Sequence, residues 1–252
     1  MDRDLDVVPL GARRPTVVPP PAPVLYGVQG FSISNYYQSA NPGGIAGSAS
    51  GFWVALLCRV DQQIAPGSRA LIARFNTIGW QLTTTLSNGQ FSFQATDGGG
   101  TTRNSLSYTI QPADLGKVMH VSGVHDGSTI RLYVNGVGVG AATACVGFTP
   151  LADRTYIGRR AVGLPNSNGI FFGACGGHAV VTAAEVTAHA NACKAAADIV
   201  PIAGKTNSLW SVKQDQAGAA PPVLDDKSAG AQDMDLVGAL TLVSVTSPVW
   251  GW

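Results

Sequence analysis

The sequence predicts an all-β fold built from antiparallel hairpins. Asp126-Gly127 and Asn135-Gly136, dipeptides that tolerate positive φ and favour two-residue hairpin turns, lie within residues 117–139. Between them, apolar and polar residues alternate over 130–135, which predicts a strand with one face on a core. Only 12% of the residues are charged and there are 31 glycines and 15 prolines. This composition is typical of many short strands joined by tight turns.

Other segments of the chain supply the further strands. Residues 52–61 have apolar side chains at both alternating positions, which predicts a central strand buried on both faces. Asn88-Gly89 predicts a hairpin turn between two neighbouring strands. Besides the three strands of 117–139, we expect strands at 28–39, 52–61, 69–75, 79–86, 90–96, 106–110, 154–160, 169–181, 207–215 and 234–245.

One helix is expected, over residues 182–199. Thr182 can cap its N-terminus, and Glu185 stands three residues further on, which is the spacing of a capping box. Val186, Ala190 and Cys193 share one face at helical spacing, and this pattern favours contact with the core.

The first 26 residues differ from the rest of the chain. They contain a run of three prolines and no periodic apolar pattern, so they favour extended polyproline geometry. We therefore divide the chain into an N-terminal arm, 1–26, and one domain, 27–252, and we expect the arm to lie against a neighbouring subunit. The predicted assembly interface consists of Arg13, Arg14, Pro19, Pro20, Pro21, Trp250 and Trp252.

Several motifs together resemble a known family. These are HDGSTIRLYVNG, TYIGRR, the glycine-rich GIFFGACGG and the helix start TAAEV. They resemble the concanavalin A-like jelly roll in its laminin-G-like form, over about residues 28–250. The resemblance implies an antiparallel two-sheet β-sandwich. SLWSVKQD and LVG resemble segments that often come first in this family, whereas here they follow the helix.

The carboxylates argue against catalysis. Some members of the superfamily are glucanases that use two glutamates on one strand, but this chain contains a single glutamate, Glu185. Asp225, Asp226, Asp233 and Asp235 lie in a Gly/Ala/Ser-rich segment, where aspartates usually form turns. No convincing GxSxG nucleophile turn occurs. We expect a protein that is not an enzyme and has no catalytic residues.

No cofactor is expected. The four cysteines form no CxxC pair, so the pattern does not favour zinc. We interpret Cys58, Cys145, Cys175 and Cys193 as buried free thiols, with disulfides as the alternative. His120 and His125 are five apart on one strand, so they face opposite sides and cannot share a ligand. Calcium, held by aspartate oxygens, is the one ion left open.

Aromatic residues offer a candidate carbohydrate site. Trp80, Tyr36 and Tyr37 could form a platform on which a sugar stacks, although core packing is the commoner use of aromatic rings. Trp53 and Trp210 lie in strand patterns and are expected in the core.

Charge and hydropathy narrow the function further. The net charge is +1 without a basic run, which argues against nucleic acid. The chain has neither an apolar stretch of about 18 residues nor a basic-then-apolar signal at its start.

We therefore predict a non-enzymatic structural or attachment protein of an extracellular assembly. The favoured form is a bacteriophage virion component, a capsid decoration or tail-associated subunit, docked by its arm to other subunits and able to form homo-oligomers. The alternative is a carbohydrate-binding, lectin-like module on a cell surface or virion.

Overall fold

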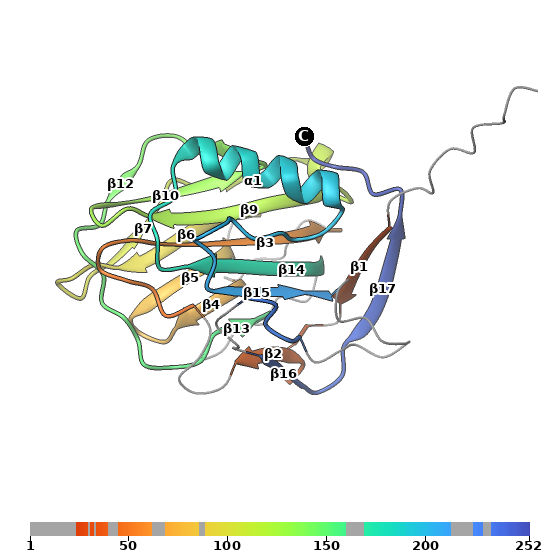
Figure 1. The fold of residues 1–252 in the computed structure, drawn as a ribbon, viewed down its shortest axis with the longest axis horizontal. Helices are drawn as coiled ribbons and strands as arrows, with labels where there is room; N and C mark the ends of the chain where they lie inside the picture. The colour runs from red at the N-terminus through yellow and green to blue at the C-terminus, as the bar shows by residue number, and fades with distance from the viewer. Residues whose placement is uncertain are drawn as a thin grey trace, which may run out of the picture.

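Two antiparallel sheets pack face to face, and one helix covers the outer face of the larger sheet (Figure 1). The computed structural model describes residues 24–29, 31–32, 34–39, 45–61, 69–85, 89–159, 169–212, 224–228 and 233–252. The predicted all-β, two-sheet sandwich with one short helix is confirmed. Within the described ranges, no helix is long and apolar enough to cross a membrane.

Within the described residues, the larger sheet has nine strands. β12 (Thr143–Ala144) pairs with β10, and β15 (Ser208–Ser211) pairs with β14. The other strands follow in the spatial order β11 (Val137–Gly138), β10 (Thr129–Val134), β9 (Val118–His125), β3 (Phe52–Val60), β14 (Gly169–Gly177), β1 (Val24–Gln29) and β17 (Thr241–Thr246).

The smaller sheet has eight strands in the ranges that the structure describes, and β8 (Tyr108–Thr109) pairs with β6. A short 3₁₀ turn, η1 (Pro112–Asp114), and the helix α1 (Ala183–Ala196) complete the described elements. The spatial order of the strands is β16 (Met234–Val237), β2 (Tyr36–Ser39), β13 (Tyr156–Ile157), β4 (Arg69–Phe75), β5 (Gly79–Thr85), β6 (Gln90–Thr96) and β7 (Thr102–Asn104).

The central strand β3 contributes side chains to two separate cores in the described part of the chain. Its side chains alternate, because successive residues of a strand point to opposite faces. Phe52, Val54 and Leu56 face the smaller sheet and belong to the main core between the sheets. Trp53 and Leu57 face the other way and belong to a second core on the outer face of the larger sheet. The predicted burial on both faces is therefore confirmed.

The second core lies beneath α1. Thr182 accepts a hydrogen bond from the backbone N–H of Glu185, and the Glu185 carboxylate accepts one from the backbone N–H of Thr182, which confirms the capping box. The helix stops at Ala197, whose left-handed backbone (φ 48°) ends the α-helical pattern. Val186 and Cys193 pack into the second core, as their spacing predicts.

Of the predicted hairpin turns, Asn135-Gly136 has positive φ at both residues, whereas in Asp126-Gly127 only the glycine does. In the third, Asn88 lies outside the described residues. Asn135 and Gly136 both have positive φ, 55° and 79°, between β10 and β11. Gly127, in the turn between β9 and β10, has φ 95°. Positive φ at both central positions is the type I′ arrangement, which matches the twist of the flanking strands.

The turn at Asp126 gives a prediction about pH. Its carboxylate accepts hydrogen bonds from the N–H and hydroxyl groups of Ser128 and Thr129. Burial alone would raise the Asp126 pKa, but these bonds lower it to about 2. Because the unfolded value is about 3.9, the bonds stabilise the fold fully above about pH 4 and are lost as the pH falls towards 2.

We expect Asp126→Ala to lower the free energy of unfolding by about 1 kcal/mol at pH 7. Urea unfolding from pH 7 down to pH 2.5 or below checks this result. The difference between the wild type and the variant should shrink below about pH 4, and a difference that stays constant down to the lowest pH would contradict this account of the turn.

The first strands differ from their prediction. The segment expected as one strand, 28–39, contains the end of β1 and all of β2. β1 begins at Val24, inside the predicted arm, because its backbone pairs with β17 from Val24 onward. Arg13, Arg14, Pro19, Pro20 and Pro21 lie outside the described residues, so the docking of the arm stays a prediction.

The four cysteines are buried free thiols, and the disulfide alternative is not observed. Cys58 and Cys145 lie in the core between the sheets, whereas Cys175 and Cys193 lie in the second core. The last pair comes from β14 and α1.

Candidate functional site

Two of the three residues predicted to stack on a sugar are buried in the core. Trp80 and Tyr37 are both 0% exposed. The Trp80 indole N–H donates to the Ile45 carbonyl at 3.0 Å, and its ring lies 6.2 Å from that of Phe52. Neither ring can meet a ligand in this fold, so the prediction was wrong for these two residues. Their strands point them inward, which the sequence pattern around them did not reveal.

Tyr36 has the opposite orientation. It is half-buried on β2, beside Arg159, whose guanidinium carbon lies 4.1 Å from the centre of the Tyr36 ring. The centres of the Tyr156 and Tyr36 rings are 6.1 Å apart. The guanidinium carbon of Arg159 also lies 5.3 Å from the centre of the Tyr156 ring. Burial and the neighbouring Asp153 raise the Tyr156 pKa, so its hydroxyl stays protonated at neutral pH. The group combines two aromatic rings and a cation on the outer face of the smaller sheet.

A row of polar side chains continues from this group across the same face. Strand register places residues of β6, β5, β4, β13, β2 and β16 opposite one another. Their sequence neighbours Leu82, Ile72 and Ile157 belong to the main core, so the row points away from it. We call it the polar row: Gln94, Gln81, Tyr156, Gln38 and Asp235, with the apolar Ala73 between Gln81 and Tyr156.

Solvent exposure varies along the polar row. Asp235 is exposed and Gln38 is half-buried at the end near Tyr36. Gln81 is 3% exposed near the middle, where its amide N–H donates to Gln94 Oε1. Gln81 Oε1 is buried and has no hydrogen-bond partner among the described residues. Tyr156 is only 9% exposed, so the accessible groups of the row are Asp235 and the half-buried Gln38 and Gln94.

The C-terminal tryptophans lie against their own domain. Val118 N–H donates to Val249 O at 2.8 Å and Gly251 N–H to Val118 O at 2.9 Å, which joins the segment to β9. The rings of Trp250 and Trp252 are 5.1 Å apart and half-buried. Their predicted role in an assembly interface stays a prediction.

The carboxylates have structural partners. Glu185, already engaged at the helix start, lies 2.6 Å from Lys205, and the bonds from Lys205 and Thr182 lower its pKa to about 2. Asp226 accepts hydrogen bonds from the backbone N–H groups of Leu209 and Ser228, and this confirms its interpretation as a turn former. Because its pKa is about 2, the Glu185 carboxyl is a poor general acid at neutral pH.

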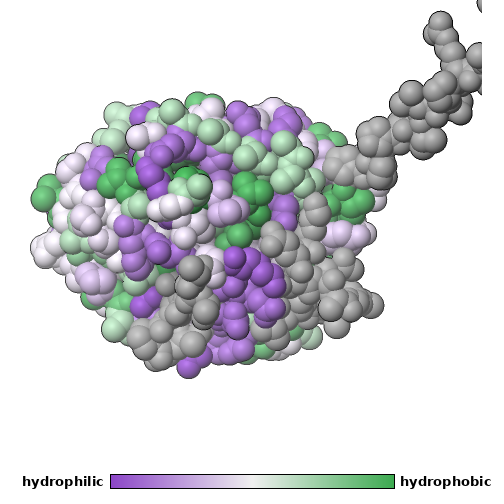
Figure 2. Space-filling model, in the orientation of Figure 1, coloured by the Kyte–Doolittle hydropathy of each residue, from purple (hydrophilic) through white to green (hydrophobic). Residues whose placement is uncertain are grey.

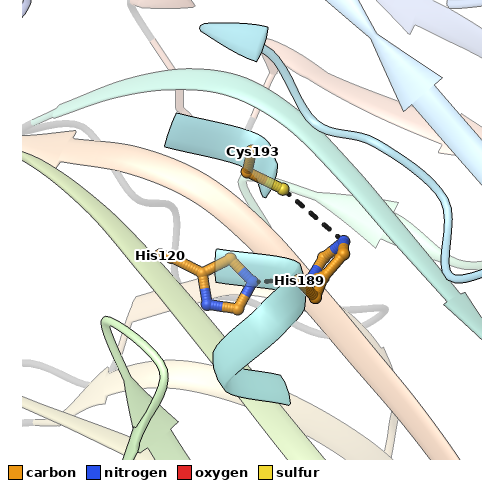
Figure 3. Close-up of side chains that lie close together, drawn as sticks. All are labelled: His120, His189 and Cys193. Atoms are coloured by element: carbon orange, nitrogen blue, oxygen red, sulfur yellow. Dashed lines mark hydrogen bonds between the residues drawn. The ribbon is translucent and has the colours of Figure 1, made fainter. Parts of the chain in front are cut away.

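A cluster of histidines and cysteines lies between the larger sheet and α1. Figure 3 shows His120 from β9 pointing at His189 of α1, with Cys193 one helical turn further on. His120 Nε2 and His189 Nδ1 are 2.9 Å apart. The Sγ atoms of Cys193 and Cys175 each lie 3.5 Å from His189 Nε2. As predicted, His125 faces the other side of β9, where its Nε2 bonds to the carbonyls of Cys145 and Gly147.

Hydrogen-bond partners fix the tautomers of the cluster. His189 Nε2 is 2.7 Å from Val200 O, and because a carbonyl only accepts, this nitrogen carries the proton. His189 Nδ1 is then an acceptor and His120 Nε2 its donor. His120 Nδ1, which is buried, has no hydrogen-bond partner among the described residues. Burial lowers the pKa of both histidines and raises that of the Cys193 thiol to about 12, so the cluster is uncharged at neutral pH.

A groove of about 220 Å³ runs beside α1 and reaches His189. On the face that carries α1, apolar side chains are scattered between polar ones rather than gathered in one large patch (Figure 2). The groove is lined by Glu185, Ala188, His189, Ala192, Pro201 and Ile202.

Comparison with known proteins places the chain in a family. The model of the concanavalin A-like lectin/glucanases superfamily matches residues 32–174, more than half of the chain, so the protein belongs to this superfamily. This confirms the resemblance of the sequence motifs. No curated protein matches the chain.

Solved structures share the fold at low sequence identity. A Bacteroides ovatus protein to which carbohydrate binding has been ascribed matches with a TM-score of 0.62 and 15% identity, over 90% of this chain and 61% of the other. The binding domain of Paraclostridial Mosquitocidal Protein 1 has a TM-score of 0.46 and 15% identity, over 57% and 38%. A heptameric SAP-like pentraxin from Limulus polyphemus has 0.47 and 15%, over 66% and 81%. The chain spans less than two thirds of the first two structures.

Sequence reasoning missed the histidine–cysteine cluster. One signal was present: His189 and Cys193 are four apart on a helix, so they share a face. The other members come from β9 and β14, and only the fold brings them beneath the helix.

Proposed function

We propose that this protein is a non-enzymatic carbohydrate-binding protein. Its family includes lectins, and the protein from Bacteroides ovatus, similar in fold, has been assigned the same kind of ligand. The proposed binding surface is the end of the polar row formed by Tyr156, Gln38 and Asp235, together with Tyr36 and Arg159.

The group around Tyr36 is the observation that carries this proposal. An aromatic ring packs against the C–H face of a sugar, in the way that aromatic side chains cover other apolar surfaces. Amide and carboxylate groups accept from sugar hydroxyls and amides also donate to them, which orients the ring. Tyr36 supplies the first kind of contact, while Gln38 and Asp235 supply the second.

The proposal that this protein is not an enzyme rests on the roles of its carboxylates. Glycoside hydrolysis usually requires a positioned acid and a second carboxylate. The one glutamate of the chain caps a helix and pairs with Lys205, so its carboxyl group has a structural role rather than that of a general acid.

We expect Tyr36→Ala to weaken glycan binding about 10-fold, because it removes one stacking ring. A glycan array identifies the ligand first, with calcium and with chelator in separate arms, since calcium stays a prediction. Calorimetry on the best ligand then compares the variants.

Two matched variants make this test specific. Tyr36→Phe keeps the ring and should retain most of the glycan affinity. Tyr108→Ala removes a half-buried tyrosine from β8 in the same sheet and should leave the glycan affinity unchanged. Unchanged binding by Tyr36→Ala, or no glycan bound by the wild type, would refute the proposal.

The narrower role as a bacteriophage virion subunit also stays a prediction. It depends on residues 1–26 docking to a neighbouring subunit, and most of these residues lie outside the described part of the chain. Glycan binding is compatible with this role, because an attachment subunit could recognise host glycans.

A further inference from the structure

The cluster beneath α1 contains the donor atoms that a soft divalent cation prefers. Imidazole nitrogen and thiolate sulfur together are the usual ligands of Zn²⁺. One donor atom each from His120, His189 and Cys193 lies within 4.8 Å of the other two. We propose that these three residues bind a metal ion of the Zn²⁺ class, at a site separate from the proposed glycan surface.

The positions of the three ligands come from rigid elements. His189 and Cys193 are one turn apart on α1, and His120 projects from the centre of the larger sheet (Figure 3). Two zinc-bound nitrogens are about 3.3 Å apart in a tetrahedral site, as Zn–N bonds of about 2.0–2.1 Å require. The present His120–His189 separation of 2.9 Å would need to widen by only a few tenths of an ångström.

The hydrogen bonds of the cluster already orient His189 as a ligand. Its Nε2–H donates to Val200 O, and a metal-bound histidine typically donates its second ring N–H to a carbonyl in this way. This bond leaves the lone pair on Nδ1, directed at His120. In this arrangement the ion takes the place of the proton between the two rings. The Cys193 side chain, whose Sγ now lies 3.5 Å from His189 Nε2, must turn toward Nδ1 to reach the same ion.

Metal binding displaces two protons, one that moves within His120 and one that Cys193 releases to solvent. His120 now carries its proton on Nε2, while its buried Nδ1 has no partner in the part of the chain that the structure describes. A change of tautomer moves the proton to Nδ1 and frees the Nε2 lone pair without any change in charge. Cys193 loses its thiol proton to solvent as the Zn–S bond forms. Cys175 offers one further sulfur in the cluster, 3.5 Å from His189 Nε2.

The groove beside α1 provides a path to the site. His189 lines both the groove and the cluster, so an ion entering beside α1 meets a ligand directly. Glu185 also lines the groove, but Lys205 and Thr182 already engage its carboxylate.

Cobalt is the probe for this site, because Co²⁺ replaces Zn²⁺ and absorbs visibly. We expect the full chain, treated with chelator and then titrated with Co²⁺, to bind one equivalent and to show a thiolate-to-cobalt charge-transfer band with the visible bands of a tetrahedral ion. Zn²⁺ should displace the cobalt and raise the melting temperature.

Variants separate this site from other thiols. Cys193→Ala and His120→Ala should lose the charge-transfer band or bind cobalt more than about 100-fold more weakly, while circular dichroism verifies that they are folded. Cys58→Ala and Cys145→Ala remove buried thiols outside the cluster and should keep the band. A folded wild type without the band, or a band that persists in Cys193→Ala, would overturn the proposal.

Discussion

Trp80→Ala is expected to lower the free energy of unfolding by about 3–5 kcal/mol. The indole is fully buried between the two sheets, where it packs near Phe52. Phe93 belongs to the same core. Truncation to alanine opens a cavity and leaves the Ile45 carbonyl without its donor, since the indole N–H bonds to it. Chemical denaturation at pH 7, with far-UV circular dichroism as the signal, measures the change.

A matched variant separates this structural role from ligand binding. Tyr36→Ala, on the outer face of the same sheet, should cost less than about 1 kcal/mol while weakening glycan binding, because half-buried surface positions tolerate truncation better. If Trp80→Ala kept its stability and lost glycan binding, the residue would be part of the ligand platform after all.

Gly123→Ala is expected to cost about 3 kcal/mol, although it adds only one methyl group. Gly123 lies on β9 and faces the smaller sheet. A Cβ at this position would lie 2.3 Å from the Phe93 ring on β6, closer than real side chains approach. The added methyl group would overlap the Phe93 ring, so Phe93 or the backbone of β9 must shift. Thermal unfolding and denaturant titration measure the loss.

Gly99→Ala is the control for the glycine change. The nearest atom to its added Cβ is 3.4 Å away, an ordinary contact, and its backbone requires no positive φ. We expect a change within about 0.5 kcal/mol. Equal effects of the two substitutions would show that the sheets do not approach as closely at Gly123 as the structure indicates.

The sequence predicts those features that depend on neighbouring residues. The alternation of β3, the turn at Asn135-Gly136 and the capping box at Thr182 and Glu185 are local patterns, and all three are confirmed. The family resemblance is carried by such segments as well, which is why it identifies the fold correctly.

Features that depend on the pairing of distant strands could not be predicted. Trp80 and Tyr36 both occur in strand patterns, but only the register of the sheets turns one inward and the other outward. His120 and His189 are 69 residues apart, and they meet because α1 folds back over β9. The polar row depends on the alignment of six strands, which no local pattern encodes.

The two proposed sites lie on opposite sides of the sandwich. The glycan surface is on the outer face of the smaller sheet, whereas the histidine–cysteine cluster is on the outer face of the larger one. Loss of the metal site by Cys193→Ala should therefore leave glycan affinity unchanged, so each proposal can fail without the other.

Nuclear magnetic resonance of the ¹⁵N-labelled protein with its best array glycan tests the central claim most directly. The account predicts that the amide signals of β2, β13 and β16 shift on titration, with Tyr36 and Gln38 among them, while those of α1 stay in place. Shifts confined to other elements, with β2 and β16 unchanged, would contradict it.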